Sequence, residues 1–412
     1  MVVPGPPDPS GTPPSVRTRL AIAAGRLTGW VSRVTGRGEG GVIGGKLALL
    51  VDPDLIATIG EARTTLVVSG TNGKTTTTHL LATALGASSS TGANLRSGLA
   101  SALIARLDSA TMVLEVDEMV LGEALSTSPR VAVLLNLSRD QLDRVGEPNI
   151  IMKRWQRVLQ EAPPGLVVAN ADDPQIVLAV GGLPTTWVSP GGMWREDSHT
   201  CPACGGLLVH DGRAWECSTC DLTRPVPDVV VDGTVVTGPW GSLGLSLALP
   251  GAYNIGNAAF ALTAAWSLGA DPAASAEAMA QVTDVLGRYV QRRRPGGTAR
   301  LLLAKNPAGW AELLELLADG RDPLVIVINS RIADGQDVSW LWDVPFERLQ
   351  GRTVVASGDR CGAMSVRLHY AGIAHSVEPD PEVALACLPP GQVDVAATYT
   401  AFSDLRRAGA DG

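Results

Sequence analysis

The chain has 412 residues, which is enough for two or three domains with hydrophobic cores of their own. Hydrophobic residues make up 45% of it and charged residues 18%, as in an ordinary globular protein. Its formal net charge of −8 argues against a protein that binds nucleic acid or anionic lipid through its overall charge. We therefore expect no nucleic acid partner.

The N-terminal segment reads as a tail followed by a helix. The first fifteen positions contain six prolines, and we interpret residues 1–17 as a disordered tail. Residues 19–34 have the spacing of an amphipathic helix, interrupted by Arg26 and Arg33. No run of about 18 uncharged apolar residues occurs in the sequence, and we expect a cytoplasmic protein.

A phosphate-binding loop is predicted next. The β-branched run at residues 64–70 leads into a loop rich in glycine and threonine, and helical apolar spacing follows. In a strand–loop–helix of this kind, backbone N–H groups and the helix dipole face an anion. We expect Lys74 to reach the outer phosphates and the hydroxyl of Thr75 or Thr76 to bind Mg²⁺. The standard loop has a glycine where Val68 stands, and the alternative interpretation is a simple turn.

Strands and helices continue to alternate, which predicts a parallel sheet with nucleotide chemistry at the carboxyl ends of its strands. Further strands are expected at residues 111–118, 131–138 and 165–173. The first ends in three acids, of which Glu115 is our first choice for Mg²⁺. The second ends in Asn136, Asp140, Gln141 and Asp143. Each acid alone could be a helix cap or a surface charge, but their shared edge favours a site.

Two Cys-x-x-Cys pairs, twelve residues apart, interrupt this alternation. They are Cys201, Cys204, Cys217 and Cys220. The spacing is typical of a zinc ribbon, and four thiolates without histidine form a closed structural site. We expect the ribbon as an insert at about residues 198–224, with redox dithiols as the alternative. Cys361 and Cys387 stand apart and are expected to be buried packing residues.

A second, smaller α/β domain is predicted after the basic cluster at residues 288–294. We interpret the cluster as a solvated linker face, with an anion contact as the alternative. The expected boundaries are 18–295 for the ATPase domain and 296–412 for the C-terminal domain. An acidic segment with two tryptophans follows the strand at residues 323–330; it contains Asp334, Asp337, Asp343 and Glu347. On pattern alone these carboxylates could equally be turn chemistry over a core.

The ordered motifs resemble those of the Mur ligases and folylpolyglutamate synthases. They read GTNGKTTT, EVDE, NLSRDQLDRVGE, NADDP and LPGAYNIGNAAFAL. The resemblance implies a Mur-ligase-like parallel-sheet ATPase domain in which ATP phosphorylates a carboxylate and an amine attacks the acyl phosphate. It implies magnesium at Thr75 and Glu115. The implied nucleotide contacts are Gly70, Thr71, Asn72, Gly73, Lys74, Thr75, Thr76, Asn257 and Arg288.

Three departures narrow the choice within that family. Gln141 stands where most Mur ligases have a metal-binding histidine, and Lys153 is only the nearest candidate for their carbamylated lysine. About 45 residues precede the sheet, too few for the usual UDP-sugar-binding domain. After residue 296 the strings KNPAG, ADGQDVSWLWD and SGDRCGAMSVRLHYAG resemble the C-terminal domain of the MurT family, the synthetase subunits of lipid II isoglutaminyl synthases. The zinc ribbon, the Gln141 replacement and the missing UDP-sugar-binding domain fit that family too.

The MurT resemblance implies amidation. ATP would phosphorylate the α-carboxylate of the D-glutamyl residue in lipid II, at the inner face of the membrane, and ammonia would displace phosphate to give D-isoglutamine. This chain has no recognisable cysteine–histidine nucleophile motif, so a GatD-type class I glutaminase is implied as the partner in a heterodimer. In the family an aspartate of the C-terminal domain assists that glutaminase, and Asp343 and Asp337 are our candidates. The alternatives are an amino-acid-adding Mur or folylpolyglutamate-type ligase and a zinc-ribbon nucleic-acid module with an ATPase.

Overall fold

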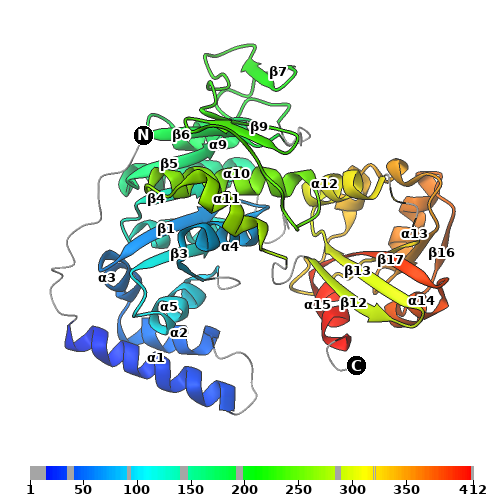
Figure 1. Ribbon diagram of the computed structural model, residues 1–412, viewed down its shortest axis with the longest axis horizontal. Helices are drawn as coiled ribbons and strands as arrows, with labels where there is room; N and C mark the ends of the chain where they lie inside the picture. The colour runs from blue at the N-terminus through cyan, green and yellow to red at the C-terminus, as the bar shows by residue number, and fades with distance from the viewer. Residues whose placement is uncertain are drawn as a thin grey trace. The chain divides into compact units, whose positions relative to one another are not determined.

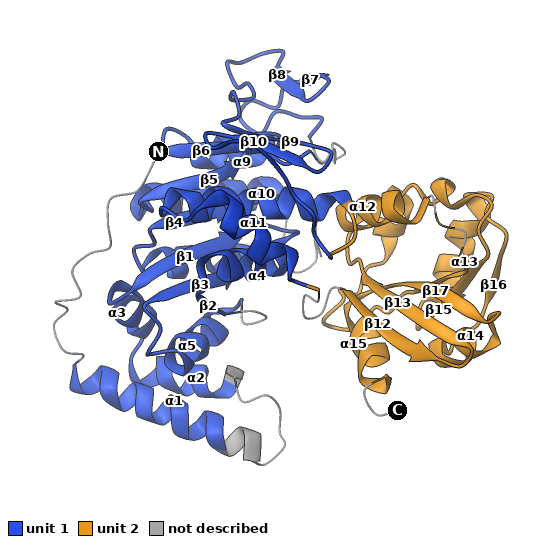
Figure 2. Ribbon diagram, in the orientation of Figure 1, with its two compact units in different colours: residues 1–137, 148–248, 252–282 blue, residues 138–147, 249–251, 283–412 orange. Residues whose placement is uncertain are grey.

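The structure is a computed structural model that describes residues 15–34, 41–90, 94–139, 147–191, 198–283, 289–318, 320 and 322–409. The chain divides into two compact units (Figure 2). Unit 1 comprises residues 1–137, 148–248 and 252–282, and unit 2 comprises residues 138–147, 249–251 and 283–412. Each unit is an α/β structure built on its own sheet.

Unit 1 contains, among the described residues, a sheet with the strand order β11-β10-β9-β6-β5-β4-β1-β3-β2. Its strands are β1 (Thr64–Ser69), β2 (Ser88–Ser89), β3 (Thr111–Val116), β4 (Val131–Leu134), β5 (Leu166–Asn170), β6 (Thr185–Ser189), β9 (Val229–Asp232), β10 (Val235–Gly238) and β11 (Gly241–Gly244). Pairing is parallel from β2 to β9, and β10 and β11 add an antiparallel edge. The central strands are buried on both faces, which is why they read as runs of Val and Leu.

Two groups of helices contact this sheet (Figure 1). One group, whose members pack on one another, is α4 (Lys74–Leu85), α10 (Ala252–Ser267) and α11 (Pro272–Ala280). The other elements are α3 (Leu55–Glu61), α5 (Arg96–Ala105), η1 (Glu118–Val120), α6 (Leu121–Leu125), α8 (Pro148–Glu161) and α9 (Pro174–Val180), with α1 (Val16–Val34) and α2 (Gly41–Val51) beyond α5. Asp173 and Asp271 cap α9 and α11, each followed by a proline that cannot donate and so suits a first helical position.

A small two-stranded insert follows β6 (Figure 1). Its strands β7 (Leu208–Asp211) and β8 (Ala214–Cys217) pair in antiparallel fashion. The insert is tied to the end of β5 because Trp215 Nε1 donates to the carbonyl of Ala171 at 3.1 Å. Arg224 Nη2 also lies 2.7 Å from a carboxylate oxygen of Asp172.

Unit 2 has a sheet with the order β12-β13-β17-β14-β15-β16, parallel except for β12 against β13. The elements are β12 (Tyr289–Arg294), β13 (Gly297–Leu303), α12 (Pro307–Ala318), β14 (Leu324–Val327), η2 (Ser339–Asp343), η3 (Phe346–Leu349), β15 (Val354–Ser357), α13 (Cys361–Tyr370), β16 (His375–Val377), α14 (Pro381–Cys387), β17 (Gly391–Ala397) and α15 (Tyr399–Ala408). Separate apolar clusters lie on its two faces, one around Trp310 and Phe346 and the other around Phe402. The expected α/β architecture, a parallel-sheet domain followed by a second, smaller α/β domain, is confirmed.

The basic cluster does not form a solvated linker in its described part. Residues 289–294 form β12, and Arg294 is only 8% exposed. Its guanidinium donates to the carbonyl oxygens of Leu385 at 3.1 Å and Gly391 at 3.2 Å. The interpretation of a linker face is therefore wrong here, because these residues form a paired strand in which Arg292 and Arg294 donate to carbonyl oxygens, although Arg293 is exposed.

Two further sequence expectations concern exposure. Cys361 is half-buried and Cys387 is exposed, so the expectation that both are buried is wrong. They stand at the first residue of α13 and the last residue of α14, where a helix end faces solvent. In the part of the chain that is described, we find no helix with the length and hydropathy needed to cross a bilayer.

Candidate functional site

Two glycines shape the loop between β1 and α4. Gly70 has φ 147° and Gly73 has φ 84°, both in the region that favours glycine. A Cβ on Gly70 would lie 2.9 Å from the Cβ of Leu135, and one on Gly73 would lie 2.4 Å from Oδ1 of Asn257. The loop can therefore pass this close to the end of β4 and to α10 only with glycine at both positions.

Asn136 fixes the backbone of the same loop. Its Oδ1 accepts from the N–H of Asn72 at 2.9 Å, and its Nδ2 donates to the carbonyl of Asn72 at 3.1 Å. The N–H of Thr71 donates to the backbone carbonyl of Asn136 at 2.8 Å. The backbone of the loop is thus held by Asn136, two residues beyond the end of β4.

The N-terminus of α4 has no side-chain cap. Its N-cap is Gly73, which has no side chain to accept from the first turn. The N–H groups of Lys74, Thr75 and Thr76 are those that a helix leaves without an intrahelical acceptor. Together with the helix dipole they favour a phosphate at this position.

Lys74 is buried in a ring of oxygen atoms. Its Nζ lies 3.0 Å from Oε2 of Glu118, with side chains 4% and 5% exposed. It also donates to the carbonyl oxygens of Gly70 and, at 3.3 Å, Thr71. Glu118 opens the 3₁₀ turn η1 after β3, and its own carbonyl accepts from Nε1 of Trp155 at 2.9 Å. The ammonium group is therefore positioned at the loop before any ligand binds.

Thr75 and Glu115 form a second polar contact beside the first. Thr75 Oγ1 donates to Oε1 of Glu115 at 2.9 Å, and both residues are buried. Glu115 is brought there by the parallel pairing of β1 with β3, in which it lies beside Val68. A hydroxyl and a carboxylate in contact offer the hard oxygen ligands that Mg²⁺ prefers. This donor set fits a magnesium site.

The other predicted nucleotide contacts have mixed outcomes. Asn257 of α10 lies at the loop, where Thr77 Oγ1 donates to its Oδ1 at 3.4 Å. Arg288 lies outside the described residues, as do Asp140, Gln141 and Asp143. Lys153, the nearest candidate for a carbamylated lysine, is exposed on α8.

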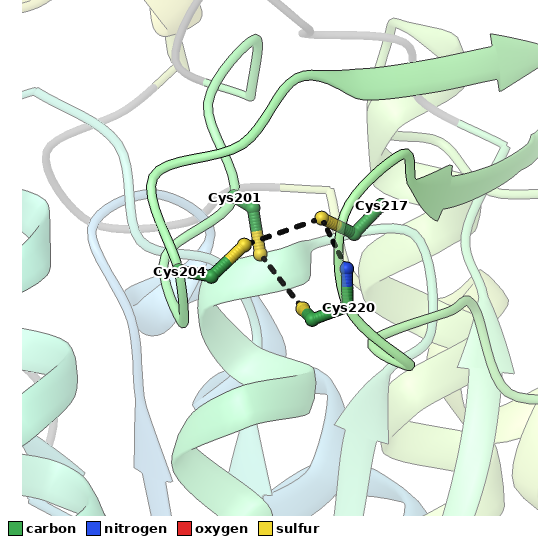
Figure 3. A group of neighbouring side chains, drawn as sticks. All are labelled: Cys201, Cys204, Cys217 and Cys220. Carbon is green, nitrogen blue, oxygen red and sulfur yellow. Dashed lines mark hydrogen bonds between the residues drawn. The ribbon is translucent and has the colours of Figure 1, made fainter.

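The four cysteines of the insert converge on one point (Figure 3). Their Sγ atoms all lie within 4.8 Å of one another. Cys204 Sγ is 3.4 Å from Cys217 Sγ, and Cys201 Sγ is 3.7 Å from Cys220 Sγ. Zn–S bonds of about 2.3 Å in a tetrahedron place sulfur atoms roughly 3.8 Å apart. The cluster therefore fits a tetrahedral metal site that would close the insert.

The thiol pKa values show why a cation suits this cluster. Burial would raise the pKa of Cys217, but N–H donors from Thr219 and Cys220 lower it to about 6. An N–H donor from Leu222 would lower the pKa of Cys220, but the neighbouring Cys204 and burial raise it to about 12. The cluster therefore favours one thiolate, and the negative charge of that thiolate opposes ionisation of the neighbouring thiols. A bound metal cation would compensate this charge repulsion.

The acidic segment of unit 2 places its carboxylates in different surroundings. Asp343 Oδ2 lies 3.1 Å from Nη1 of Arg139, with side chains 42% and 32% exposed. Both residues belong to unit 2, although they are far apart in the sequence. Asp343 therefore lies at the surface of unit 2, already beside a cation.

Asp337 caps a turn. Its carboxylate accepts from the N–H and the hydroxyl of Ser339, both at 2.8 Å. The hydrogen bond from the Ser339 N–H, followed by that from its hydroxyl, lowers the pKa of Asp337. Asp334 is buried and accepts from the N–H of Thr400 at 2.8 Å, which ties the segment to α15. Of the two tryptophans, Trp340 packs against the core and Trp342 is exposed.

Comparison with known proteins matches these features to two domain families. The Mur ligase middle domain matches residues 68–188, and the MurT ligase C-terminal domain matches residues 303–402. The subunit MurT of lipid II isoglutaminyl synthase (glutamine-hydrolyzing) from Streptococcus pneumoniae is 29% identical over 403 residues, covering 87% of this chain and 88% of that protein. The chain therefore combines a Mur ligase middle domain with a MurT-type C-terminal domain.

Other relatives show the same similarity. The MurT subunit of Staphylococcus aureus strain COL is 29% identical over 393 residues, covering 87% of this chain and 89% of that protein. A pseudomurein peptide ligase type C from Methanothermus fervidus has the same fold, with a TM-score of 0.66 at 19% identity over 86% of this chain and 80% of that one. The curated relatives that cover most of this chain are subunits of a ligase, and the chain is an enzyme of that class.

Two residues at the loop between β1 and α4 stand outside the predicted contact set. Glu118 pairs with Lys74, and Asn136 holds the loop backbone. Both lie in the polar strand ends that the sequence indicated, EVDE and NLSRDQLDRVGE. The polar composition of these strand ends marks both residues as candidates, but it does not distinguish a residue that contacts a ligand from one that supports the loop.

Proposed function

We propose that this chain is the ATP-dependent synthetase subunit of an amidotransferase that acts on lipid II. It would activate the α-carboxylate of the D-glutamyl residue as an acyl phosphate, and ammonia would displace phosphate to give D-isoglutamine. The supporting observation is that one chain combines a phosphate loop around Lys74 with a MurT-type C-terminal domain. The similarity to the S. pneumoniae MurT subunit extends over 87% of this chain and 88% of that protein.

The phosphate loop would bind ATP. The first-turn N–H groups of α4 and the ammonium of Lys74 would stabilise the negative charge of the transferring phosphoryl group. Thr75 and Glu115 would hold Mg²⁺, which supplies positive charge to the phosphates when bound. Asn257 would contact the nucleoside, and Arg288 is assigned to the nucleotide on the resemblance alone.

Glu118 would have a supporting role in this site. Its carboxylate lies on Lys74 Nζ at 3.0 Å in a buried setting, where an unpaired ammonium would be costly. Phosphate oxygens would share the ammonium with Glu118 when nucleotide binds. The side chain of Lys74 then needs little movement, so its orientation is established in advance.

Ammonia would come from a separate GatD-type class I glutaminase bound to this chain. Asp343 and Asp337 are the proposed residues that assist its cysteine–histidine pair. Asp343 is partly exposed and beside Arg139, and Asp337 carries a lowered pKa that keeps it ionised at neutral pH. Either carboxylate could orient an imidazole at a subunit interface.

The test is an amidation assay of the complex with lipid II, ATP and Mg²⁺, with mass spectrometry of the stem peptide. We expect conversion of the carboxylate to an amide with glutamine, and also with ammonium chloride in place of glutamine. ADP release that depends on an added amino acid, with no response to ammonia, would contradict the proposal. That result would favour an amino-acid-adding ligase instead.

A further inference from the structure

Among their described side chains, helices α1 and α2 bury mainly small residues and expose most of their large apolar ones. The buried positions are Thr18, Ala21, Gly25 and Gly29 of α1 and Gly44, Gly45 and Ala48 of α2. The exposed apolar side chains are Val16, Leu20, Leu27 and Trp30 of α1 and Ile43, Leu47 and Leu50 of α2. Their exposed fractions run from 38% for Leu47 to 79% for Leu50. A helix at the surface of a soluble domain shows the opposite distribution.

Close packing fixes this orientation. A Cβ on Gly44 would lie 2.7 Å from the carbonyl oxygen of Gly25, and one on Gly45 would lie 1.8 Å from that of Ser97. Thr18 Oγ1 donates to Asp52 Oδ2 at 2.8 Å, which ties α1 to the end of α2. Neither helix can turn its large apolar residues inward without forcing backbone apart.

The exposed residues form one stripe along each helix. Val16, Leu20, Leu27 and Trp30 are separated by three- and four-residue steps or their sum, as are Ile43, Leu47 and Leu50. Among the described residues, the two helices contribute seven of the 21 exposed large apolar side chains. Concentration of this kind on two adjacent helices marks an interaction surface.

The charge around the stripes is of one sign. Neither α1 nor α2 contains Asp or Glu, whereas Arg17, Arg19, Arg26 and Lys46 are all exposed there. From Val16 to Val51 the sequence has six basic residues against one acid, Glu39. The whole chain carries −8, whereas every charged residue of these two helices is basic.

We propose that the α1–α2 pair docks on an anionic lipid surface, with both helices lying in the plane of the interface. An apolar stripe flanked by Lys and Arg, with Trp at the boundary, is the pattern of an interfacial helix. Arg and Lys would meet lipid phosphates while Leu20 and Leu27 enter the acyl boundary. A bilayer span is not implied, since neither described helix is long and apolar enough.

A second copy of this chain fits the same surface less well. It would bring another acid-free helix pair, so basic side chains would meet basic side chains without carboxylates to compensate them. The inference stands on the helix pair alone; its link to amidation of lipid II rests on the proposed function.

The test is flotation of the full chain with vesicles of phosphatidylcholine alone or mixed with phosphatidylglycerol, without lipid II or nucleotide. We expect binding to the anionic vesicles and at least about tenfold weaker binding to the neutral ones. L20S/L27S and R26E/K46E should each lower binding to anionic vesicles by about tenfold or more. Because no substrate is present, the outcome is independent of whether the chain amidates lipid II.

Matched controls change the surface elsewhere. R157E/R348E makes the same change in net charge at two exposed arginines, and V226S removes an apolar side chain that is 88% exposed. Both should bind like the wild type, and thermal melts should show that every variant is folded. Equal loss in a control, equal binding to neutral vesicles or no binding by the wild type would overturn the proposal. So would light scattering that shows a dimer converted to a monomer by L20S/L27S.

Discussion

The ammonium of Lys74 lies 3.0 Å from the carboxylate of Glu118, and the two side chains are 4% and 5% exposed. The pair joins the start of α4 to the turn after β3. A buried ion pair of this kind contributes little net stability compared with apolar packing, but it is costly to break from one side. It therefore couples the proposed phosphate site to the stability of the sheet.

Lys74→Ala should abolish ATP-dependent amidation and also lower the melting temperature. The phosphates lose their cation, and the buried carboxylate of Glu118 loses its ion pair with Lys74, which should reduce the free energy of unfolding. Lys74→Arg keeps the charge and is the matched control for stability. ADP release near the wild-type rate in a folded Lys74→Ala protein would contradict the phosphate role.

Glu115→Gln should raise the Mg²⁺ concentration needed for half-maximal ADP release by about tenfold or more, because a hard cation loses a charged ligand. Thr75→Val should act in the same direction, while Thr75→Ser retains the hydroxyl and should remain close to the wild type. A titration of activity against Mg²⁺ at saturating ATP measures this. An unchanged Mg²⁺ dependence in Glu115→Gln would remove that residue from the site.

Asp343→Asn and Asp337→Asn separate the two candidates for the glutaminase partner. The variant that removes the assisting residue should lose glutamine-dependent amidation and recover with ammonium chloride. Folding should be nearly unaffected by Asp343→Asn, since its pair with Arg139 is exposed and such pairs contribute about 0–1 kcal/mol. Failure of ammonia to rescue, with the complex intact, would place the residue beside the acyl phosphate. Wild-type rates in both variants would leave the segment a capped turn.

Cys201→Ser and Cys217→Ser should each remove about one zinc per chain and lower the melting temperature. Cys387→Ser changes an exposed thiol outside the cluster and should alter neither quantity. Metal analysis of freshly purified protein gives the zinc content. Wild-type protein without zinc would reject the metal but not the convergence of the four thiols.

Acidification should release metal from the same cluster. Protons compete with the cation for thiolates, and the pKa of Cys217 in the metal-free cluster is about 6. Zinc retention should therefore fall as pH is lowered, and the stability that the metal supplies should be lost with it. Equilibrium dialysis across a pH series, with Cys387→Ser in parallel, measures the release.

The strand–loop–helix at residues 64–85 could be read from the sequence because strand, loop and helix signals are local there. The cysteine cluster was equally accessible, since its two pairs carry their own spacing. The pairing of Lys74 with Glu118 could not be predicted from the sequence, because it depends on where η1 turns after β3. The contact of Arg139 with Asp343 joins residues 204 positions apart and has no local signal.

The basic cluster at residues 288–294 also has contacts that local composition does not predict. Composition favoured a solvated face at residues 288–294, but Arg294 is satisfied by carbonyls from α14 and β17 that only the folded sheet brings near. Likewise, the overall charge of −8 gives no indication that the charged residues of α1 and α2 are all basic. Averages over the chain conceal features that are confined to one helix pair.

The attachment of the cysteine insert to β5 has a thermodynamic consequence. Trp215 and Arg224 contact Ala171 and Asp172, which follow β5. The next residue, Asp173, accepts a hydrogen bond at 2.7 Å from the N–H of Leu137, three residues beyond the end of β4. If zinc binds the cluster only in the folded chain, it adds about 1.4 kcal/mol to the free energy of unfolding for each tenfold rise in the free zinc concentration. The melting temperature of this enzyme would then be a function of zinc activity, so that two preparations differing only in chelator would unfold at different temperatures.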